Sequence, residues 1–570
     1  MKDQQSWRRK AILIPFLTLG VILIARLFYL QIIQGNLYRA LAIGQQETAE
    51  QTSGARGKIF CYDKNSITPL VINKIYKLCY AVPKEIENPD EVATKIAEIF
   101  GLSKDEILPK LSNKDSQYFL IKEKLDEKEL SLITNANIKG IYLREGQSVY
   151  YPQKEIASNL LGFVDEENNG QYGIQASQND VLKGKTDLVK REKSFFGMFT
   201  ADSQETLDGS DIILTIDLNI QREADKILEE AYKDLQFREG EILIVDPMTG
   251  RILAAASYPN YDPNNYKDYA KNMDVFQLGP VQKLYEPGSV LKAVNMAIAL
   301  DAGAVTPTTT FYDKGFVQIG KWKIENYGKK SYGYQDMTNV LEFSINTGSV
   351  FAEMKVPHDN YMDYLTKFGF FESTGIDTAG EVYSANSELK AGREIGFANC
   401  AFGQGISMTP LRLAMAYSAL VNGGKLMKPY IVEKVLQPNG KTIENKPQIV
   451  RQVIKPETSE QIKKMLNSVT EIGFSNRAMV AGYYVGGKTG TAQKPIGGTY
   501  SQTRAWHTFT GVAPIYNPRI MAVIKLDEPQ RSEASLSAAP LFRHLAKYIL
   551  DYYQVPTERD PKEQKRMTVD

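Results

Sequence analysis

The sequence predicts an α+β fold for the main part of the chain, on three observations. Strand-like segments occur at residues 211–215 and 241–255, helical periodicity dominates the stretch that follows, and strand-like segments return near 481–488 and 508–526. A sheet supplied by both ends of a domain, with helices from its middle, is typical of an α+β fold whose sheet closes late in the sequence. At 570 residues the chain is long for one domain and is expected to hold two or three folded units.

The first element is an apolar run at residues 11–33, interrupted by Arg26 and preceded by Trp7-Arg8-Arg9-Lys10. If the Arg26 side chain extends toward the membrane surface, the run reaches the roughly 20 residues needed to span a bilayer. The basic residues predict a cytoplasmic tail at residues 1–10 and place everything after the run outside. The alternative is a cleaved signal peptide, but the candidate cleavage triplet Ala40-Leu41-Ala42 lies far beyond the apolar core. We therefore expect an uncleaved single-pass anchor.

Residues 34–206 mix short strands and helices and carry no pattern that indicates catalysis. Glu91–Phe100 is predicted to be a helix, with Val92 and Ile96 on one face and Gly101 as its stop. Ser103 is positioned to cap the next short helix. We interpret this part of the chain as a non-catalytic spacer or docking domain.

The character of the chain changes at residue 207, where a second domain is expected to run to residue 552. Residues 211–215 predict a strand and Asp217 opens an amphipathic helix. Two apolar segments, 241–245 and 251–255, flank an Asp-Pro…Gly turn and predict a hairpin. Residues 553–570 are charged and proline-bearing, and are expected to be a disordered tail.

Composition excludes several classes of protein. A net charge of +1, from 68 basic and 67 acidic residues, gives no reason to expect nucleic-acid binding. Cys61 and Cys79 could form a disulfide bond in an oxidising compartment, and the alternative is that they are small buried residues. The three histidines, His358, His507 and His544, have no metal-ligand spacing, so a zinc site is not expected. No cofactor is expected.

Three short strings, in one order, carry the chemistry. They are Ser289-Val290-Leu291-Lys292, Ser344-Ile345-Asn346 and Lys488-Thr489-Gly490-Thr491. Each pattern is weak evidence by itself, because it recurs in this chain. The S-x-x-K pattern also occurs at Ser387-Glu388-Leu389-Lys390, and the S-x-N pattern also occurs at Ser177-Gln178-Asn179 and Ser384-Ala385-Asn386. The three strings that begin at Ser289, Ser344 and Lys488 differ from these repeats. They follow one another in the order S-x-x-K, S-x-N, K-T-G-T, a glycine precedes Ser289, and the last string belongs to a glycine-bearing strand.

Ser289 follows Gly288 and precedes a nearly continuous apolar run to Leu300, which predicts a buried helix with Ser289 at its amino terminus. Exposed amides there favour developing negative charge. Lys292 is one turn away on the same face, and it can act as a base only if its pKa is depressed. The alternative is an ordinary N-cap serine followed by a solvated lysine. Ser344-Ile345-Asn346 fits a loop that aims two polar groups into a cleft, with a plain turn as the alternative.

The third string is ambiguous, because residues 482–489 also fit the phosphate-binding pattern G-x-x-x-x-G-K-T. A phosphate-binding loop must lead into a helix, and residues 492–498, with Pro495 and two glycines, cannot form one. The strand interpretation is therefore favoured. A strand with small residues at a sheet edge lets a peptide lie alongside it as an added strand.

With these motifs in place, the chain resembles the class B penicillin-binding proteins, which are membrane-anchored D,D-transpeptidases of peptidoglycan. The resemblance also rests on Arg56-Gly57-Lys58-Ile59, Tyr150-Tyr151-Pro152, Leu214-Thr215-Ile216-Asp217, Tyr285-Glu286-Pro287-Gly288-Ser289 and Phe402-Gly403-Gln404-Gly405. Departures from the family pattern occur at Lys64-Asn65-Ser66 and Gly173-Ile174-Gln175. The resemblance implies a single-pass anchor, an elongated mixed pedestal resembling a dimerisation domain, and a penicillin-binding/serine β-lactamase-like transpeptidase domain. That last domain would have an antiparallel sheet with helices on both sides.

The resemblance also implies roles for the motif residues. Ser289 would be the nucleophile, Lys292 its base, and Lys488 the charge that helps to keep Lys292 neutral. Asn346 would bind a peptide amide, and Ser344 would relay a proton to the leaving D-alanine. The amides of Ser289 and Thr491 would hold the oxyanion. Thr489 and Thr491, with Lys488, would hold the substrate's terminal carboxylate, and the substrate-binding segment is Thr489-Gly490-Thr491.

The implied substrates are donor and acceptor peptidoglycan stem peptides, with β-lactams as inhibitors, at the bacterial cytoplasmic membrane. Residues 510–514 and 527–530 are more similar to the septal, cell-division type than to the elongation type. A membrane glycosyltransferase and division-complex proteins would then be partners. The alternatives are an elongation-type enzyme, a D,D-carboxypeptidase or β-lactamase, a β-lactam-sensing receptor, and a non-catalytic division protein.

Overall fold

The computed structural model describes residues 26, 47–116, 118–193, 199–200 and 207–560. It divides into two compact units, Met1–Ala55 with Gly184–Gly209, and Arg56–Lys183 with Ser210–Asp570. Apart from Arg26, the predicted anchor at residues 11–33 and the tail at 1–10 lie outside the described residues. Within the described part of the chain, no helix has the length and apolar content to cross a membrane.

The first unit contains a three-stranded antiparallel sheet in the order β1-β8-β9. Its strands are β1 (Glu47–Ser53), β8 (Thr186–Lys193) and β9 (Phe199–Thr200). β1 and β8 pair along their whole length, from Glu47 opposite Glu192 to Ser53 opposite Thr186. The two ends of the predicted pedestal segment therefore meet in one small sheet.

A seven-stranded sheet lies at the start of the second unit and crosses the domain boundary expected at residue 207. Its strand order is β19-β18-β10-β2-β3-β4, and β5 also pairs with β3. The strands are β2 (Ile59–Asp63), β3 (Ser66–Ala81), β4 (Phe119–Lys122), β5 (Ile141–Tyr150), β10 (Asp211–Asp217), β18 (Val432–Leu436) and β19 (Thr442–Glu444). β10 runs parallel to β2 and antiparallel to β18. The pedestal and the second domain are thus joined through shared strands and not only through a linker.

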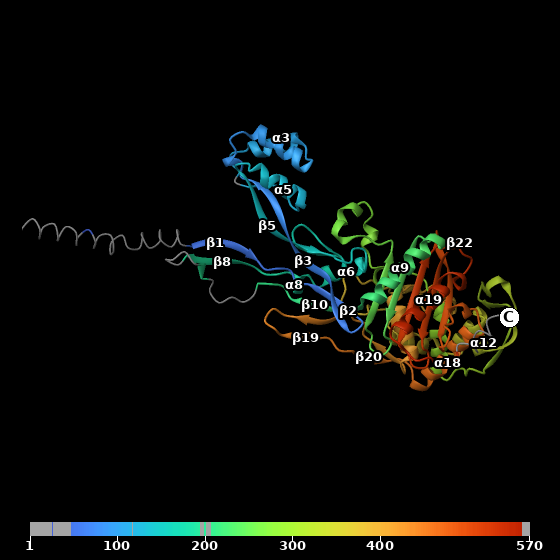
Figure 1. Ribbon diagram of the computed structural model, residues 1–570. Coiled ribbons are helices and arrows are strands. Elements are labelled where there is room, and N and C mark those ends of the chain that lie inside the picture. Colours follow the sequence, from blue (N-terminus) through green and yellow to red (C-terminus); the bar gives the residue numbers. More distant parts are fainter. Residues whose placement is uncertain (1–25, 27–46, 117, 194–198, 201–206, 561–570) are drawn as a thin grey trace, which may run out of the picture. The chain divides into compact units, whose positions relative to one another are not determined.

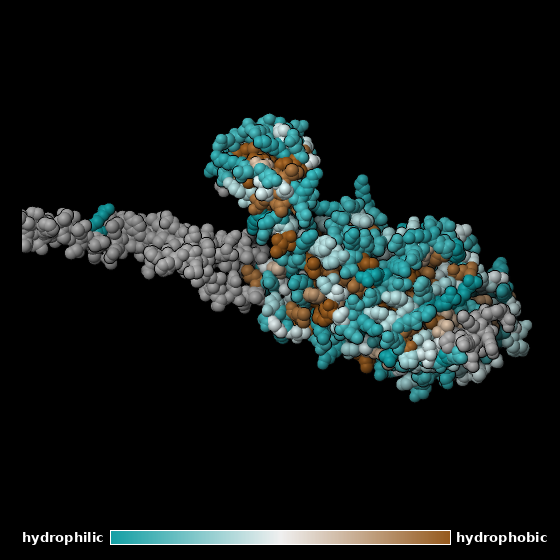
Figure 2. Space-filling view, in the orientation of Figure 1, coloured by the Kyte–Doolittle hydropathy of each residue, from teal (hydrophilic) through white to brown (hydrophobic). Residues whose placement is uncertain are grey.

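The far half of β3, with β4 and β5, forms a lobe that is covered by helices α3 (Pro89–Phe100), α4 (Lys104–Ser112) and α5 (Glu127–Ala136). Gly101 ends α3 in the left-handed conformation, with φ of 65°, as predicted. Ser103 occupies the N-cap position of α4 but makes no side-chain capping bond. Hydrophobic residues gather on this lobe in Figure 2, and Ile75 and Tyr118 are among its exposed large side chains. Shorter pedestal elements are η2 (Pro83–Glu85), α6 (Ser158–Leu161), β6 (Phe163–Val164), β7 (Gly170–Gln171), α7 (Gly173–Ser177) and α8 (Asn179–Leu182).

The possible disulfide is not formed, and all three cysteines are free and buried. Cys61 on β2 lies opposite Thr68 on β3, whereas Cys79 lies eleven residues further along the same strand. At about 3.3 Å per residue this separates the two cysteines by roughly 36 Å. That distance is far beyond the reach of a disulfide bond.

The second domain is built on a five-stranded antiparallel sheet in the order β12-β11-β23-β22-β21. The predicted hairpin is β11 (Glu239–Val245) with β12 (Ile252–Tyr258), and β21 (Gly486–Ile496), β22 (Thr499–Ala513) and β23 (Ile520–Asp527) complete the sheet. β11 pairs directly with β23 over its whole length. The sheet therefore closes late in the sequence, as predicted.

Helices cover both faces of this sheet. Ile242 and Ile244 of β11 pack with α9 (Leu218–Leu235) and α19 (Ala538–Tyr552), which lie against the sheet in Figure 1. The alternate residues Leu243 and Val245 pack with α11 (Lys292–Asp301), α17 (Pro410–Val421) and α18 (Pro456–Glu471). Because successive strand residues point to opposite faces, this division places the two helix groups on opposite sides of the sheet. Asp217 caps α9 by accepting from the amides of Asn219 and Ile220.

Further elements complete the second domain. They are η3 (Pro263–Tyr269), η4 (Met273–Phe276), α10 (Gly279–Gln282), β13 (Thr310–Asp313), β14 (Phe316–Ile319), β15 (Trp322–Glu325), η6 (Tyr327–Lys329), β16 (Gly333–Asp336), α12 (Met337–Glu342), α14 (His358–Lys367), α16 (Glu394–Cys400), β17 (Lys425–Met427) and β20 (Ile449–Gln452).

The expectation of a disordered tail from residue 553 is corrected for its first part, since residues 553–560 are packed on the domain. The Val555 carbonyl accepts from the Tyr483 hydroxyl at 2.5 Å, and Arg559 forms an ion pair with Glu471 at 2.5 Å. The charges that suggested disorder are therefore used in contacts with the end of α18 and the segment before β21. Residues 561–570 lie outside the described part of the chain.

Candidate active site

Ser289 lies in a short 3₁₀ turn, η5 (Gly288–Leu291), directly before α11. The backbone amide of Lys292 donates to the Ser289 carbonyl, and all ten residues of α11 are buried. The turn requires glycine at position 288, where φ is +62° and an added Cβ would lie 2.9 Å from the Cβ of Ala492. Ser289 is thus held at the head of a buried helix, as its sequence context predicts.

The edge strand β21 passes close to this turn. A Cβ added to Gly490 would lie 2.8 Å from the Pro287 carbonyl oxygen and 3.2 Å from the Val290 amide nitrogen. Gly288 faces Ala492 on the same strand, so the turn and the strand approach each other on both sides of Ser289. This places the Ser289 backbone beside Thr491, where two amides could serve one oxyanion.

Replacing Gly490 with alanine is expected to lower the rate of acylation by a β-lactam about 10- to 100-fold. The added methyl group must push β21 away from the Ser289 turn, and a displacement of about 1 Å at a reaction centre has effects of that size. Stopped-flow acylation kinetics measure the change. Gly303→Ala is the matched control, because it strains a positive φ of 69° with no atom within 4 Å of the new methyl group. An acylation rate for Gly490→Ala equal to that of Gly303→Ala would contradict the close approach.

The side chain of Lys292 joins the Ser289 string to the Ser344 string through polar contacts. Its Nζ lies 2.5 Å from the Ser344 carbonyl oxygen, 3.2 Å from Ser344 Oγ and 2.6 Å from Asn346 Oδ1. Ser344 has a left-handed backbone with φ of 53°, and Asn346 is the first residue of α13 (Asn346–Met354). Asn346 Nδ2 donates to the Glu325 carbonyl at 2.9 Å, which turns Oδ1 toward the lysine. Among the described residues no hydrogen bond joins Ser289 Oγ to Lys292 or Ser344, although the roles implied for those two residues require both to lie close to that hydroxyl.

Two lysines are completely buried at this place, since both Lys292 and Lys488 have 0% relative exposure. Burial lowers the pKa of Lys292 well below its ordinary value, and the neighbouring Lys488 lowers it further. Burial alone lowers the pKa of Lys488 to about 7. A neutral Lys292 can donate to the Ser344 carbonyl and Asn346 Oδ1, and it keeps a lone pair for a hydroxyl proton. The geometry therefore suits a lysine that acts as a base.

The third string supplies the opposite wall. Lys488 Nζ donates to the Thr489 carbonyl at 3.1 Å, and the Thr489 amide donates to Ser475 Oγ at 3.2 Å. Thr491 Oγ1 accepts from the amide of Ala534 at 3.0 Å, within the turn η8 (Ala534–Leu536). Because that hydroxyl is used as an acceptor, its own proton stays available for a substrate carboxylate.

Three supporting residues carried no signal in the sequence. Ser475 is completely buried and fixes Thr489, and Ala534 acts only through its backbone amide. His507 lies opposite Thr491 in the β21–β22 register, and its Nδ1 lies 2.8 Å from Ser537 Oγ. Burial lowers the pKa of His507 to about 4, so it is neutral at physiological pH. None belongs to a recognisable local pattern, because each acts through a long-range contact.

The repeated motifs are not part of this site. Ser387 and Lys390 are exposed on the short helix α15 (Ser387–Lys390). The G-x-x-x-x-G-K-T pattern runs into the strand β21, which continues to Ile496, so no helix follows it. This supports the strand interpretation over a phosphate-binding loop.

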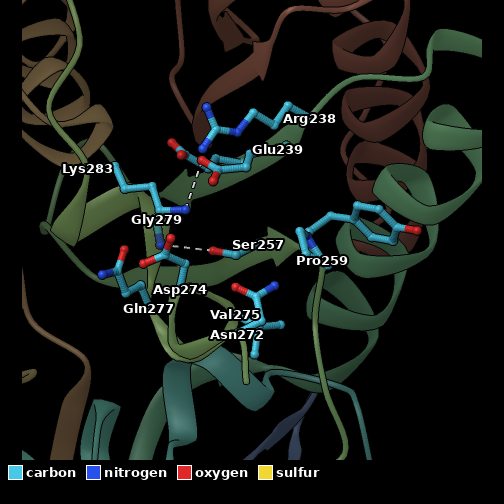
Figure 3. A pocket seen from close by; sticks show the side chains of 13 residues that line it. Arg238, Glu239, Ser257, Pro259, Asn272, Asp274, Val275, Gln277, Gly279 and Lys283 are labelled. Carbon is cyan, nitrogen blue, oxygen red and sulfur yellow. Dashed lines mark hydrogen bonds and ion pairs between the residues drawn. The ribbon is translucent and has the colours of Figure 1, made fainter. Parts of the chain in front are cut away.

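A cavity of about 180 Å³ lies between the start of β11 and α10 (Figure 3). Its walls include an ion pair between Lys283 and Glu239 at 2.8 Å, and the Gly279 amide donates to Ser257 Oγ at 3.0 Å. The motif residues are not among its lining residues. It is therefore not the candidate active site.

Comparisons with known proteins agree with this arrangement. Residues 240–547 match the penicillin binding protein transpeptidase domain, and residues 51–214 match the penicillin-binding protein dimerisation domain. Stage V sporulation protein D of Bacillus subtilis is 31% identical over 525 residues, which is 90% of this chain and 80% of that protein. A Mesostigma viride protein named peptidoglycan D,D-transpeptidase FtsI homolog is 31% identical over 576 residues, 95% of each chain. The crystal structure of penicillin binding protein 3 from Mycobacterium tuberculosis, complexed with ampicillin, is similar with a TM-score of 0.69 and 25% identity, covering 90% of this chain and 98% of that chain.

Proposed function

The chain belongs to the class B penicillin-binding proteins, and from this premise we propose that it is a membrane-anchored serine D,D-transpeptidase that cross-links peptidoglycan stem peptides. The observation that carries the proposal is the position of Lys292. One amine contacts both polar residues of the Ser344 string, lies one turn from Ser289, and has its pKa lowered by burial and further by Lys488. No single string predicts such a junction.

Acylation is the first half of the proposed reaction. Lys292 takes the proton of Ser289, and Ser289 Oγ attacks the carbonyl carbon between the two D-alanines of a donor stem peptide. The amides of Ser289 and Thr491 hold the oxyanion, and loss of one such donor typically costs about a hundredfold or more in rate. Ser344, in contact with Lys292, passes a proton to the leaving D-alanine nitrogen as the C–N bond breaks.

Transfer to the acceptor is the second half. An amine of a second stem peptide attacks the carbonyl carbon of the Ser289 ester, the new C–N bond forms, and the C–O bond to Ser289 breaks. A proton from the attacking nitrogen passes through Lys292 to Ser289 Oγ. A β-lactam mimics the donor and stops at the acyl-enzyme. Lys488, Thr489 and Thr491 bind the terminal carboxylate of either substrate or inhibitor, with Asn346 on a peptide amide.

We place the catalytic domain outside the cytoplasmic membrane, anchored by residues 11–33 with the amino terminus inside. The sequence of residues 510–514 and 527–530 favours a role in septal wall synthesis, with a membrane glycosyltransferase and division-complex proteins as partners. Depleting the protein in its host is expected to give filaments or blocked septa. Rounded cells would instead indicate the elongation-type role.

The transpeptidase assignment is tested by incubating the full chain in detergent with two synthetic stem peptides. The donor ends in D-Ala-D-Ala and has its side-chain amine blocked, and the acceptor has a free side-chain amine. Mass spectrometry is expected to find a cross-linked dimer and free D-alanine. A product that consists only of donor shortened by one D-alanine would favour the D,D-carboxypeptidase alternative.

A further inference from the structure

Aminolysis constrains where the acceptor must bind, if the proposed transpeptidase function holds. The attacking amine reaches the same carbonyl carbon that the leaving D-alanine amine has just left. By microscopic reversibility it occupies the same place, beside the group that protonated the leaving amine. The acceptor therefore enters on the side of the site formed by Ser344 and Thr489.

A cavity of about 290 Å³ lies on this side. Its lining includes Phe343, Ile472, Phe474, Arg477, Glu533 and Leu536, and we call it the Arg477 cavity. Its volume fits part of a peptide, since ligand pockets begin at roughly 300 Å³.

Each wall of the Arg477 cavity is connected to one of the catalytic strings, either through the adjacent residue in the sequence or through a hydrogen bond. Phe343 directly precedes Ser344, and Ser475 is flanked by two lining residues while its Oγ accepts from the Thr489 amide at 3.2 Å. Ala534 lies between Glu533 and Ser535 and donates to Thr491 Oγ1 at 3.0 Å. A ligand in the cavity therefore contacts the residue before Ser344 and the sequence neighbours of Ser475 and Ala534, the two residues that hold Thr489 and Thr491.

The walls are also fastened to each other. The Phe474 amide donates to the Glu342 carbonyl at 3.2 Å, and the Phe343 and Phe474 rings meet edge to face at 6.3 Å. A Cβ on Gly473 would lie 2.4 Å from the Glu342 carbonyl oxygen, so the segment before β21 is packed closely against the end of α12. The walls of the cavity are consequently held in place by contacts within the domain.

The lining combines exposed apolar side chains with two opposite charges. Ile472 is 65% exposed and Phe474 is 46% exposed, beside the opposite charges of Arg477 and Glu533. Neither charged side chain has an ion-pair partner among the residues that the structure describes. A ligand with a carboxylate, an ammonium group and an aliphatic chain would satisfy all three kinds of contact.

From this we infer that the Arg477 cavity binds the acceptor stem peptide, with Arg477 on a peptide carboxylate, Glu533 on the side-chain ammonium as it enters, and Ile472 and Phe474 on the aliphatic chain. In the step itself, the ammonium group loses one proton to bulk base and becomes a neutral amine, the amine nitrogen forms the C–N bond, and the C–O bond to Ser289 breaks. The second amine proton passes by way of Ser344 and Lys292 to Ser289 Oγ. No further reactant is required.

The test separates donor use from acceptor use in the full chain. The enzyme is acylated with a D-alanyl thioester, and aminolysis is followed against the concentration of a synthetic stem tetrapeptide with a free side-chain amine. Arg477→Gln and Glu533→Gln are each expected to raise the half-saturating acceptor concentration about tenfold, the usual effect of losing one charge-assisted contact. Their acylation rates with a fluorescent penicillin should stay within about twofold of wild type, because neither residue touches the nucleophile.

Arg543→Gln is the matched control, since Arg543 is exposed on α19 and does not line the cavity. If the wild-type enzyme makes dimer but both cavity variants keep the wild-type half-saturating acceptor concentration, the acceptor assignment is overturned and the proposed function is not. A parallel loss of penicillin acylation would also overturn it, because the residues would then act on the donor site. A wild-type enzyme that makes no dimer would overturn the proposed function itself.

Discussion

Replacing Ser289 with alanine is expected to abolish covalent labelling of the protein by a fluorescent penicillin. In the proposed mechanism the acyl-enzyme is an ester of Ser289 Oγ, and no other hydroxyl at the site combines a helix-head position with a buried lysine one turn away. The substitution should leave the fold intact, because in the described structure Ser289 Oγ makes no hydrogen bond to Lys292 or Ser344. In-gel fluorescence after denaturation measures the labelling, and thermal unfolding checks the fold.

The chain supplies its own control for this experiment. Ser387→Ala removes the serine of the second S-x-x-K string, which is exposed on α15, and it should leave labelling unchanged. Labelling that persists in Ser289→Ala would show that another residue is the nucleophile. The same would follow if Ser387→Ala removed the label.

Much of the fold could be predicted because its signals are local. The hairpin of β11 and β12, the glycine that stops α3 and the late strands of the five-stranded sheet all follow from periodicity and turn residues. The parallel pairing of β10 with β2 could not be predicted, since the partners come from different predicted domains. The same limit explains the C-terminal segment, where Arg559 is ordered by Glu471, 88 residues away.

The three strings of the site could be predicted from the sequence, but the contacts between them could not. The sequence places Ser289 and Lys292 one turn apart, but it cannot show that Lys292 contacts Ser344 and Asn346, more than 50 residues away. Ser475 and Ala534 could not be predicted as part of the site for a different reason. They hold Thr489 and Thr491 through a side-chain oxygen and a backbone amide that many residue types could supply. Ser475, Ala534 and Phe343 connect the three strings to the Arg477 cavity.

Replacing Lys292 with methionine is expected to lower the rate of penicillin acylation by about 10²- to 10⁴-fold, the usual contribution of a general base. Methionine keeps the apolar stem of the side chain but cannot take the Ser289 proton. Lys390→Met is the matched control, because Lys390 is the exposed lysine of the second S-x-x-K string. An acylation rate for Lys292→Met within about tenfold of wild type would remove Lys292 from the role of base.

Stability against pH gives Lys292→Met a second readout, independent of activity. In the unfolded chain a lysine holds its proton up to about pH 10.4, whereas burial and Lys488 lower the pKa of Lys292 in the folded protein. Between those two pKa values the unfolded state binds more protons, so the free energy of unfolding of the wild type should rise with pH. Lys292→Met should show a smaller rise in urea titrations across the alkaline range, and Lys390→Met should follow the wild type. If the Lys292→Met and wild-type curves were parallel, Lys292 would carry its ordinary pKa in the fold and would be charged at neutral pH, and a charged lysine cannot accept the serine proton.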